Sequence, residues 1–144
     1  MKKKIIIITA CTIITIITIG IVGCSNSSPM SFELDYEELM KEKHVTWATS
    51  VNAGDKFEIT LGSNPTTGFT WPNIAQIIDS DIVKQTNHEF ISTDSNAVVG
   101  ASGKDVWTFR ALKKGTTTIQ MNYSQSWDGG EKSEWSLVAT ITVR

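Results

Sequence analysis

Cysteine and histidine are scarce in this sequence, and their scarcity excludes several kinds of site. Of 144 residues, two are cysteines (Cys11 and Cys24) and two are histidines (His44 and His88). Because both cysteines precede residue 25, the rest of the chain offers no disulfide, no thiol nucleophile and no cysteine metal ligand. Two distant histidines do not form a zinc site. We therefore expect no cofactor or metal, and a domain held by its hydrophobic core.

The sequence also lacks the excess of positive charge that a polyanionic partner would require. Lys and Arg number 13 against 15 Asp and Glu, and three of the lysines stand at positions 2–4. Without those three the chain is acidic, mainly through residues 33–42. A nucleic-acid-binding surface needs clustered Lys and Arg, so nucleic acid is not an expected partner.

The N-terminus has the form of an export signal. The lysines at positions 2–4 precede an isoleucine-rich apolar run from Ile5 to Val22. A charged start followed by an apolar core is typical of a signal peptide. The run is also long enough for an uncleaved membrane helix. Either interpretation places the rest of the chain outside the cytoplasm.

A cysteine follows this run directly. Ile21-Val22-Gly23-Cys24 resembles the lipobox of bacterial lipoproteins, with Ile where Leu is commoner. The resemblance implies that Cys24 is lipidated and anchors the domain to the bacterial cell membrane, on the extracellular or periplasmic side. We accordingly divide the chain into a lipoprotein-type signal peptide (1–23), a lipidated cysteine with a tether or pre-domain segment (24–44) and a globular domain (45–144).

Alternation of apolar and polar residues dominates the sequence from Val45 onward. A period of two is typical of a strand with one buried face. Residues 74–78 allow a short helix or turn, and residues 32–44 are compatible with either a helix or a strand. Many short strands separated by turn residues predict an all-β, immunoglobulin-like antiparallel β-sandwich. The alternating runs are 45–51, 57–61, 106–111, 117–123 and 135–143.

Three long connections are expected at one end of this sandwich, namely 62–69, 92–104 and 124–134. Successive strands of an antiparallel sandwich run in opposite directions. If 69–91 holds one descending and one rising strand, all three loops lie at the same end and the tight turns at the other. Loops grouped on a rigid scaffold commonly form a binding surface.

The first loop carries the sequence Asn64-Pro65-Thr66-Thr67-Gly68-Phe69. Pro65 fixes its own φ and restricts Asn64, while Gly68 permits a positive φ. The two threonines are stiff at χ1. These residues predict a rigid, uncharged finger, although an ordinary turn uses the same residue types.

The other two loops carry small residues and a tryptophan. Gly100-Ala101-Ser102-Gly103 allows another surface to approach the backbone closely, or forms a flexible linker. Gln125-Ser126-Trp127 precedes a polar, glycine-rich stretch. Trp127 is either an exposed contact residue or a side chain folded back onto the sandwich.

These motifs, in this order and spacing, resemble the chagasin-like family of papain-type cysteine protease inhibitors. Residues 64–69 match the family's NPTTG-aromatic signature, 100–103 resemble its GxGG loop, and 123–127 resemble its Tyr-x-Arg-Pro-Trp loop. The resemblance covers about residues 45–144. It implies a reversible, tight-binding, monomeric inhibitor that blocks the active-site cleft of a papain-family, cathepsin-like cysteine protease without a covalent step.

By this resemblance the first loop enters the cleft and the other two straddle it. Ser102 replaces a family glycine, and Gln125 and Ser126 replace Arg and Pro, which predicts altered affinity or target preference. Loss of the Arg removes a forked cationic donor. The residues expected to contact the protease are Asn64, Pro65, Thr66, Thr67, Gly68, Phe69, Gly100, Ala101, Ser102, Gly103, Gln125, Ser126 and Trp127.

Other functions have weaker support in the sequence. Ser95, His88 and Asp94 could be assembled into a triad only on paper, and His88 is expected to be a surface strand residue. Asp128 and Glu131 lack the spacing of an EF-hand calcium loop. A surface-anchored, immunoglobulin-like binding or adhesion module is the alternative to an inhibitor, because the fold alone does not determine function.

Overall fold

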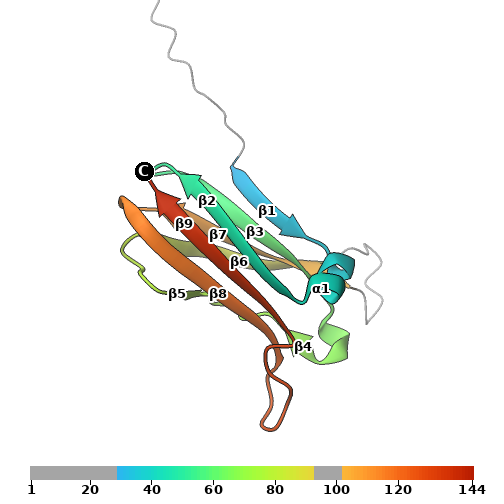
Figure 1. Cartoon of the computed structure of the whole chain (residues 1–144). Coiled ribbons are helices and arrows are strands. Elements are labelled where there is room, and N and C mark those ends of the chain that lie inside the picture. Colours follow the sequence, from blue (N-terminus) through green and yellow to red (C-terminus); the bar gives the residue numbers. More distant parts are fainter. Residues whose placement is uncertain (1–28, 93–101) are drawn as a thin grey trace, which may run out of the picture.

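Two β-sheets packed face to face form the computed structural model, which describes residues 29–92 and 102–144 (Figure 1). One sheet has the strand order β1-β3-β7-β6, and the other β2-β9-β8-β4, with β5 also paired to β8. The strands are β1 (Met30–Leu34), β2 (His44–Val51), β3 (Lys56–Ser63), β4 (Phe69–Thr70), β5 (Gln76–Ile77), β6 (Val83–Ser92), β7 (Gly103–Ala111), β8 (Gly115–Gln125) and β9 (Trp135–Val143). The helices are α1 (Tyr36–Glu42) and the 3-10 helix η1 (Pro65–Thr67).

The period of two in the sequence corresponds to real strands. All five alternating runs fall within β2, β3, β7, β8 and β9. In β9, every second residue from Trp135 to Val143 is buried, and in β3 the buried alternate positions are Phe57, Ile59 and Leu61. These side chains meet in one core between the sheets. The all-β sandwich prediction is therefore confirmed.

Strand direction and short elements differ in part from the prediction. β1 pairs with β3 in parallel, and β2 pairs with β9 in parallel, so both sheets are mixed. Within 74–78 there is no helix, because Gln76 and Ile77 form β5 against β8. The segment 32–44 contains both a strand end and a helix.

Helix α1 begins with a capping box. The Asp35 carboxylate accepts from the Glu38 N–H at 2.8 Å, and the Glu38 carboxylate accepts from the Asp35 N–H at 3.1 Å. Leu39 is fully buried, which contributes about 1.5–3 kcal/mol. The helix lies directly against β3, since a Cβ on Gly62 would stand 2.2 Å from the Tyr36 nitrogen. Gly62 thus allows two backbones to touch.

The predicted grouping of the loops at one end holds for every described strand end. Ser63, at the end of β3, and Ser92, at the end of β6, both pair with Gly103 at the start of β7. Phe69 pairs with Gln125 at the end of β8. The segment 69–91 does hold one descending path, β4 with β5, and one rising strand, β6. Residues 1–28 and 93–101, which include Cys24, Asp94, Ser95, Gly100 and Ala101, lie outside the described residues.

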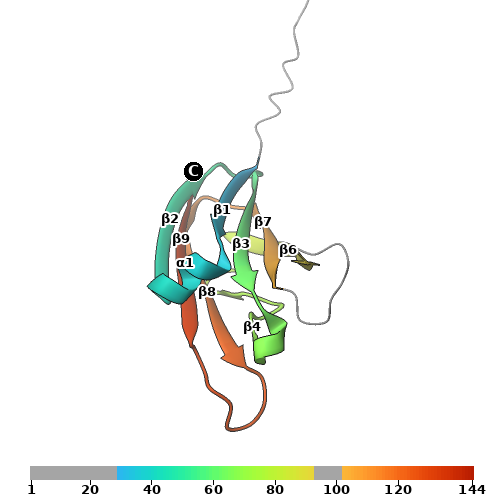
Figure 2. The ribbon, with the colours of Figure 1, turned by 90° about the vertical axis from the view of Figure 1, so that its right-hand side faces the viewer.

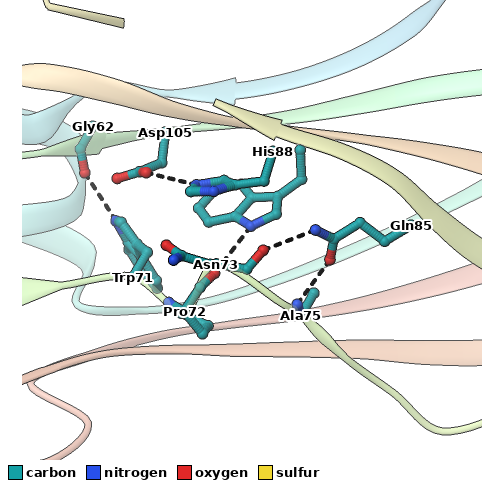
Figure 3. Close-up of polar contacts among 9 residues, drawn as sticks. Gly62, Trp71, Pro72, Asn73, Ala75, Gln85, His88 and Asp105 are labelled. Carbon is teal, nitrogen blue, oxygen red and sulfur yellow. Dashed lines mark hydrogen bonds and ion pairs between the residues drawn. The ribbon is translucent and has the colours of Figure 1, made fainter. Parts of the chain in front are cut away.

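Two tryptophans tie the sheets together through the segment that follows β4 (Figure 3). The Trp71 indole N–H donates to the Gly62 carbonyl in β3 at 3.0 Å. The Trp107 indole N–H, from β7, donates to the Pro72 carbonyl at 3.1 Å. The two indoles pack edge to face, with ring centroids 6.4 Å apart.

Gln85 on β6 completes this connection (Figure 3). Its side-chain amide donates to the Asn73 carbonyl at 2.8 Å, and its side-chain oxygen accepts from the Ala75 N–H at 2.9 Å. One side chain therefore replaces a strand partner for this irregular segment. Among the described residues, no helix is long and apolar enough to cross a membrane.

We predict that Gly62→Ala destabilises the fold by about 1–3 kcal/mol, because the added methyl group would overlap the backbone of α1. Denaturant unfolding would measure the loss. Hydrogen exchange should also show faster opening of the Leu39 and Lys43 amides, which donate within and just after α1.

Gly54→Ala is the matched control. Gly54 has a φ of 93° with nothing within 4 Å of its added Cβ, so this variant introduces left-handed strain alone. Its α1 amides should remain as protected as in the wild type. Equal loss of α1 protection in both variants would refute the role assigned to Gly62.

Candidate functional site

The segment between β3 and β4 is a tight finger built around Asn64. We call residues 64–68 the wedge loop, because the structure extends β3 to Ser63. The Asn64 side-chain oxygen accepts from the Thr66 N–H at 3.2 Å and from the Thr66 hydroxyl at 2.6 Å. Its carbonyl accepts from the Thr67 N–H at 3.1 Å and from the Thr67 hydroxyl at 2.7 Å. Asn64 thus uses both of its oxygens to shape the tip.

The remainder of the wedge loop matches the conformations expected from its sequence. Pro65 opens the 3-10 helix η1, and Gly68 closes it at a φ of 82° with its N–H donating to the Pro65 carbonyl. Pro65, Thr66 and Thr67 are exposed. A rigid, uncharged tip therefore projects from the sandwich, as the sequence predicted.

Tyr123 fixes the wedge loop to the opposite sheet. Its hydroxyl accepts from the Asn64 N–H at 2.9 Å and donates to the Asn64 carbonyl at 3.3 Å. Its ring stacks on Phe69, with centroids 5.7 Å apart, and on Trp135, with centroids 4.7 Å apart. Trp71 packs against it at 5.0 Å. Because Tyr123 is buried, its hydrogen bonds to Asn64 are shielded from water and hold the wedge loop in place.

Trp127 connects the third loop to the first. A Cβ on Gly68 would stand 2.6 Å from the Trp127 ring, so the indole lies directly over this glycine. The Trp127 side chain nevertheless remains 50% exposed. The structure thus combines the two expectations for this residue: one part of the ring covers the wedge loop and the other is free to contact a partner.

The β8–β9 loop, residues 126–134, is braced from within. The Gln125 N–H donates to the Glu131 carbonyl at 2.8 Å, and the Glu131 N–H donates to the Gln125 side-chain oxygen at 2.9 Å. The Lys132 ammonium donates to the carbonyls of Gln125 and Trp127. Ser126 is exposed. These hydrogen bonds could not be predicted from the sequence, because they depend on which loop residues face one another.

The wedge loop and the β8–β9 loop project from the same end of the sandwich (Figure 2). Of the middle motif, the structure describes Ser102, which is exposed, and Gly103, which is buried. A Cβ on Gly103 would stand 2.3 Å from the Phe90 ring and 2.6 Å from the Ile91 carbonyl oxygen. At this position the small residue serves close packing within the chain. Gly100 and Ala101 lie outside the described residues.

A small cavity opens beside the wedge loop, and we call it the aromatic pocket. Its volume is about 290 Å³. A larger hollow of about 620 Å³ opens at the opposite end of the sandwich, beside the turn at 52–55, away from the loops. The aromatic pocket is lined by Tyr36, Thr67, Phe69, Tyr123, Glu131, Glu134 and Trp135.

An ion pair stands at the edge of this pocket. The Lys43 ammonium donates to the Glu134 carboxylate at 2.7 Å. This bond raises the pKa of Lys43 and lowers the pKa of Glu134, so both groups stay charged at neutral pH. Burial, together with neighbouring Tyr123, raises the pKa of the Tyr36 hydroxyl.

His88 is not the surface residue that the sequence predicted. Its Nε2 lies 2.7 Å from the Asp105 carboxylate, and its ring stacks on Trp107 at 4.9 Å (Figure 3). Only 16% of its side chain is exposed. Within residues 29–92 and 102–144 no group of three or more His, Cys, Asp or Glu side chains could hold a metal.

Residues 50–143 match the family model described as chagasin family peptidase inhibitor I42. Amoebiasin-2 from Entamoeba histolytica is 32% identical over 108 residues, which cover 72% of this chain and 81% of amoebiasin-2. The sequence similarity therefore spans most of the sandwich and all three loop motifs.

Solved structures with the same fold agree with the sequence comparison. The crystal structure of the cysteine protease inhibitor EhICP2 from Entamoeba histolytica has a TM-score of 0.58 at 27% identity, covering 81% of this chain and 98% of EhICP2. PbICP-C, solved in complex with falcipain-2, has a TM-score of 0.57 at 16% identity, covering 80% of this chain and 99% of PbICP-C.

We predict that Tyr123→Phe loosens the wedge loop while leaving the sandwich folded. Loss of the hydroxyl leaves the Asn64 N–H without its partner, which should reduce the free energy of unfolding by about 1–3 kcal/mol. Urea unfolding measures this loss, and hydrogen exchange should become faster at the Asn64, Thr66 and Thr67 amides.

Tyr36→Phe is the matched control, since it removes a hydroxyl from the chain's other tyrosine. Similar losses of stability and of amide protection in both variants would contradict the special role of Tyr123.

Proposed function

This chain belongs to the chagasin family of peptidase inhibitors, and from that membership we propose that it blocks papain-family cysteine proteases with its clustered loops. Its family match covers residues 50–143, and the similar protein EhICP2 is a cysteine protease inhibitor. The chain is thus a protease inhibitor and not an enzyme. An adhesion module without inhibitory activity would not require the family's loop motifs.

The observation that carries the proposed mechanism is the wedge loop itself. Its exposed tip consists of Pro65, Thr66 and Thr67, held from below by Asn64 and Tyr123. The tip is uncharged and offers no group that could react with a thiolate. A rigid tip of this kind can occupy a cleft by shape, and its preorganisation lowers the entropy lost on binding.

The contacts proposed for the individual loops are those that the family resemblance implies. Thr66 and Thr67 approach the catalytic cysteine of the enzyme, and Gly100 to Gly103 contact it through the backbone. The exposed part of Trp127 stacks on an aromatic residue of the enzyme. Together the loops could bury roughly 800 Å² on this side, the size of a standard interface.

Gln125, which replaces the Arg of the family motif, stabilises the third loop from within. The side chain of Gln125 is used within the loop, where it accepts from the Glu131 N–H. It therefore stiffens the loop, in place of the forked donor that an Arg would offer. Contact with the enzyme then depends mainly on Trp127 and the wedge loop.

The placement of the inhibitor outside the cytoplasm is part of the proposal. Residues 1–23 serve as a signal peptide and Cys24 as the lipidated N-terminus, which tethers a monomeric domain to the membrane. The support is the sequence Lys2 to Cys24, with its basic start, apolar run and lipobox-like end. A retained membrane helix is the competing arrangement.

We expect residues 25–144 to inhibit papain reversibly and with one-to-one stoichiometry. This fragment contains every described strand and every buried core residue. Titration of active papain with the fragment, followed by dilution, measures both properties. Absence of inhibition of papain and of several cathepsin-like enzymes at micromolar concentrations would refute the proposed function.

Trp127→Ala tests the contribution of the third loop in the same assay. Truncation of a half-exposed interface tryptophan commonly costs about 2 kcal/mol or more, so the inhibition constant should rise by roughly thirtyfold. Circular dichroism should show an unchanged fold. An unaltered inhibition constant would remove Trp127 from the interface.

Labelling of producing cells with a radioactive or clickable palmitate precursor should modify the wild-type chain. The Cys24→Ala variant should lose the label, because its thiol is the group that accepts the lipid, and Cys11→Ala should keep it. Undiminished labelling of Cys24→Ala would contradict the lipobox assignment.

A further inference from the structure

Four aromatic side chains line the aromatic pocket. Phe69, Tyr123 and Trp135 form a stacked row, with successive centroids 5.7 and 4.7 Å apart. Tyr36 meets Trp135 edge to face at 5.0 Å. Phe69 and Tyr36 are only partly buried, so their rings remain accessible from the pocket. Aromatic faces attract cations placed within about 6 Å of the ring centre.

Carboxylates dominate the lining that is not aromatic. Glu131 and Glu134 both line the pocket, whereas the ammonium of Lys43 reaches it only by its bond to Glu134. The nearby Lys132 ammonium is occupied with the carbonyls of Gln125 and Trp127. The lining itself therefore contains two carboxylates and no cationic side chain, and one of these carboxylates, on Glu134, is paired with Lys43. Because Lys43 lowers the pKa of Glu134, that carboxylate stays ionised.

We propose that the aromatic pocket is a specificity subsite that receives one cationic side chain, lysine or arginine, from the bound protease. This inference rests on the proposed inhibitor function and defines the chemistry of the partner at one point beside the cleft. Aromatic walls accommodate the methylene stem of such a side chain, and the carboxylates meet its charged end. A volume of about 290 Å³ suits one side chain.

The position of the pocket places that side chain next to the wedge loop. Thr67, an exposed residue of the tip, is also part of the pocket lining. A group bound there would therefore lie beside the cleft that the tip enters. A purely apolar side chain would cover the Glu131 carboxylate and offer it no positive charge, so the acidic lining favours a cation.

One wall of the subsite comes from outside the region that the family model matches. Tyr36 belongs to α1, whereas the match begins at residue 50. Gly62 brings this helix against β3 and so delivers the ring to the pocket. The subsite thus contributes to the choice of target protease in addition to the three loops of the family.

Charge reversal at Glu131 tests the proposal. Both hydrogen bonds that Glu131 makes to Gln125 use its backbone, so Glu131→Lys should leave the loop intact. The inhibition constant for papain should rise at least tenfold, and the difference should shrink in 0.5 M NaCl as screening increases.

Glu58→Lys is the matched control, with the same change in net charge near the opposite end of β3. Its inhibition constant should stay within about twofold of the wild-type value. If both variants weaken inhibition equally, for papain and for each cathepsin-like enzyme that the wild type inhibits, the subsite assignment is wrong.

Titration of the fragment 25–144 with N-acetyl-lysine methylamide examines the pocket without a protease. The indole N–H signal of Trp135 should shift in NMR spectra with this probe, and much less with the uncharged N-acetyl-norleucine methylamide. Glu131→Lys should abolish the shift. An equal response to norleucine would overturn the cationic assignment in favour of an apolar occupant.

The two proposals fail in different ways. A wild-type fragment that does not inhibit any protease contradicts the proposed function, while the titration still decides whether the pocket selects a cation. A fragment that inhibits papain but responds equally to both probes contradicts the subsite alone.

Discussion

The hydrogen bonds between one buried phenol and one backbone residue determine where the wedge loop stands. Tyr123 rises from β8 in one sheet, while Asn64 follows β3 in the other. The hydroxyl engages both the N–H and the carbonyl of Asn64, and the side chain of Asn64 in turn shapes the tip. Because aromatic rings surround the phenol, the tip cannot move without disturbing the core. The binding loop is in this sense an extension of the core.

The strands and the clustering of loops were predictable because they depend on simple periodicities. One buried face imposes a period of two, and parity of strand direction then places the connections. The periodicity does not indicate whether two paired strands run parallel or antiparallel. The parallel pairs β1–β3 and β2–β9 were therefore not predicted. His88 was misjudged for a related reason: its burial depends on Asp105, seventeen positions away.

The family motifs predict which loop residues contact a protease, but they do not predict how each loop is held in place. The sequence explained Gly68 only by the positive φ that a glycine permits. The structure shows a second reason, because the Trp127 indole lies directly over this residue and leaves no room for a side chain. In the sequence, Gln125 is notable only because it replaces the Arg of the family motif. In the structure, its side-chain oxygen accepts from the Glu131 N–H and stabilises the loop. Such contacts join residues without a fixed sequence spacing. Tyr36 lies outside the motifs altogether and still forms a wall of the pocket beside the wedge loop.

The parallel pairing of β1 with β3 has a consequence for the direction in which the molecule faces. Met30 pairs with Phe57, at the end of the sandwich opposite the wedge loop, and the C-terminal Arg144 lies at that same end (Figure 1). The five residues between Cys24 and Met30 can span at most about 20 Å. On a chain anchored at Cys24, the base of the sandwich would rest near the lipid, and the loops would stand roughly 35 Å further out, the length of β8. The binding loops would then point away from the membrane. They would be accessible to proteases in solution, but not to proteases bound close to the surface of the same bilayer.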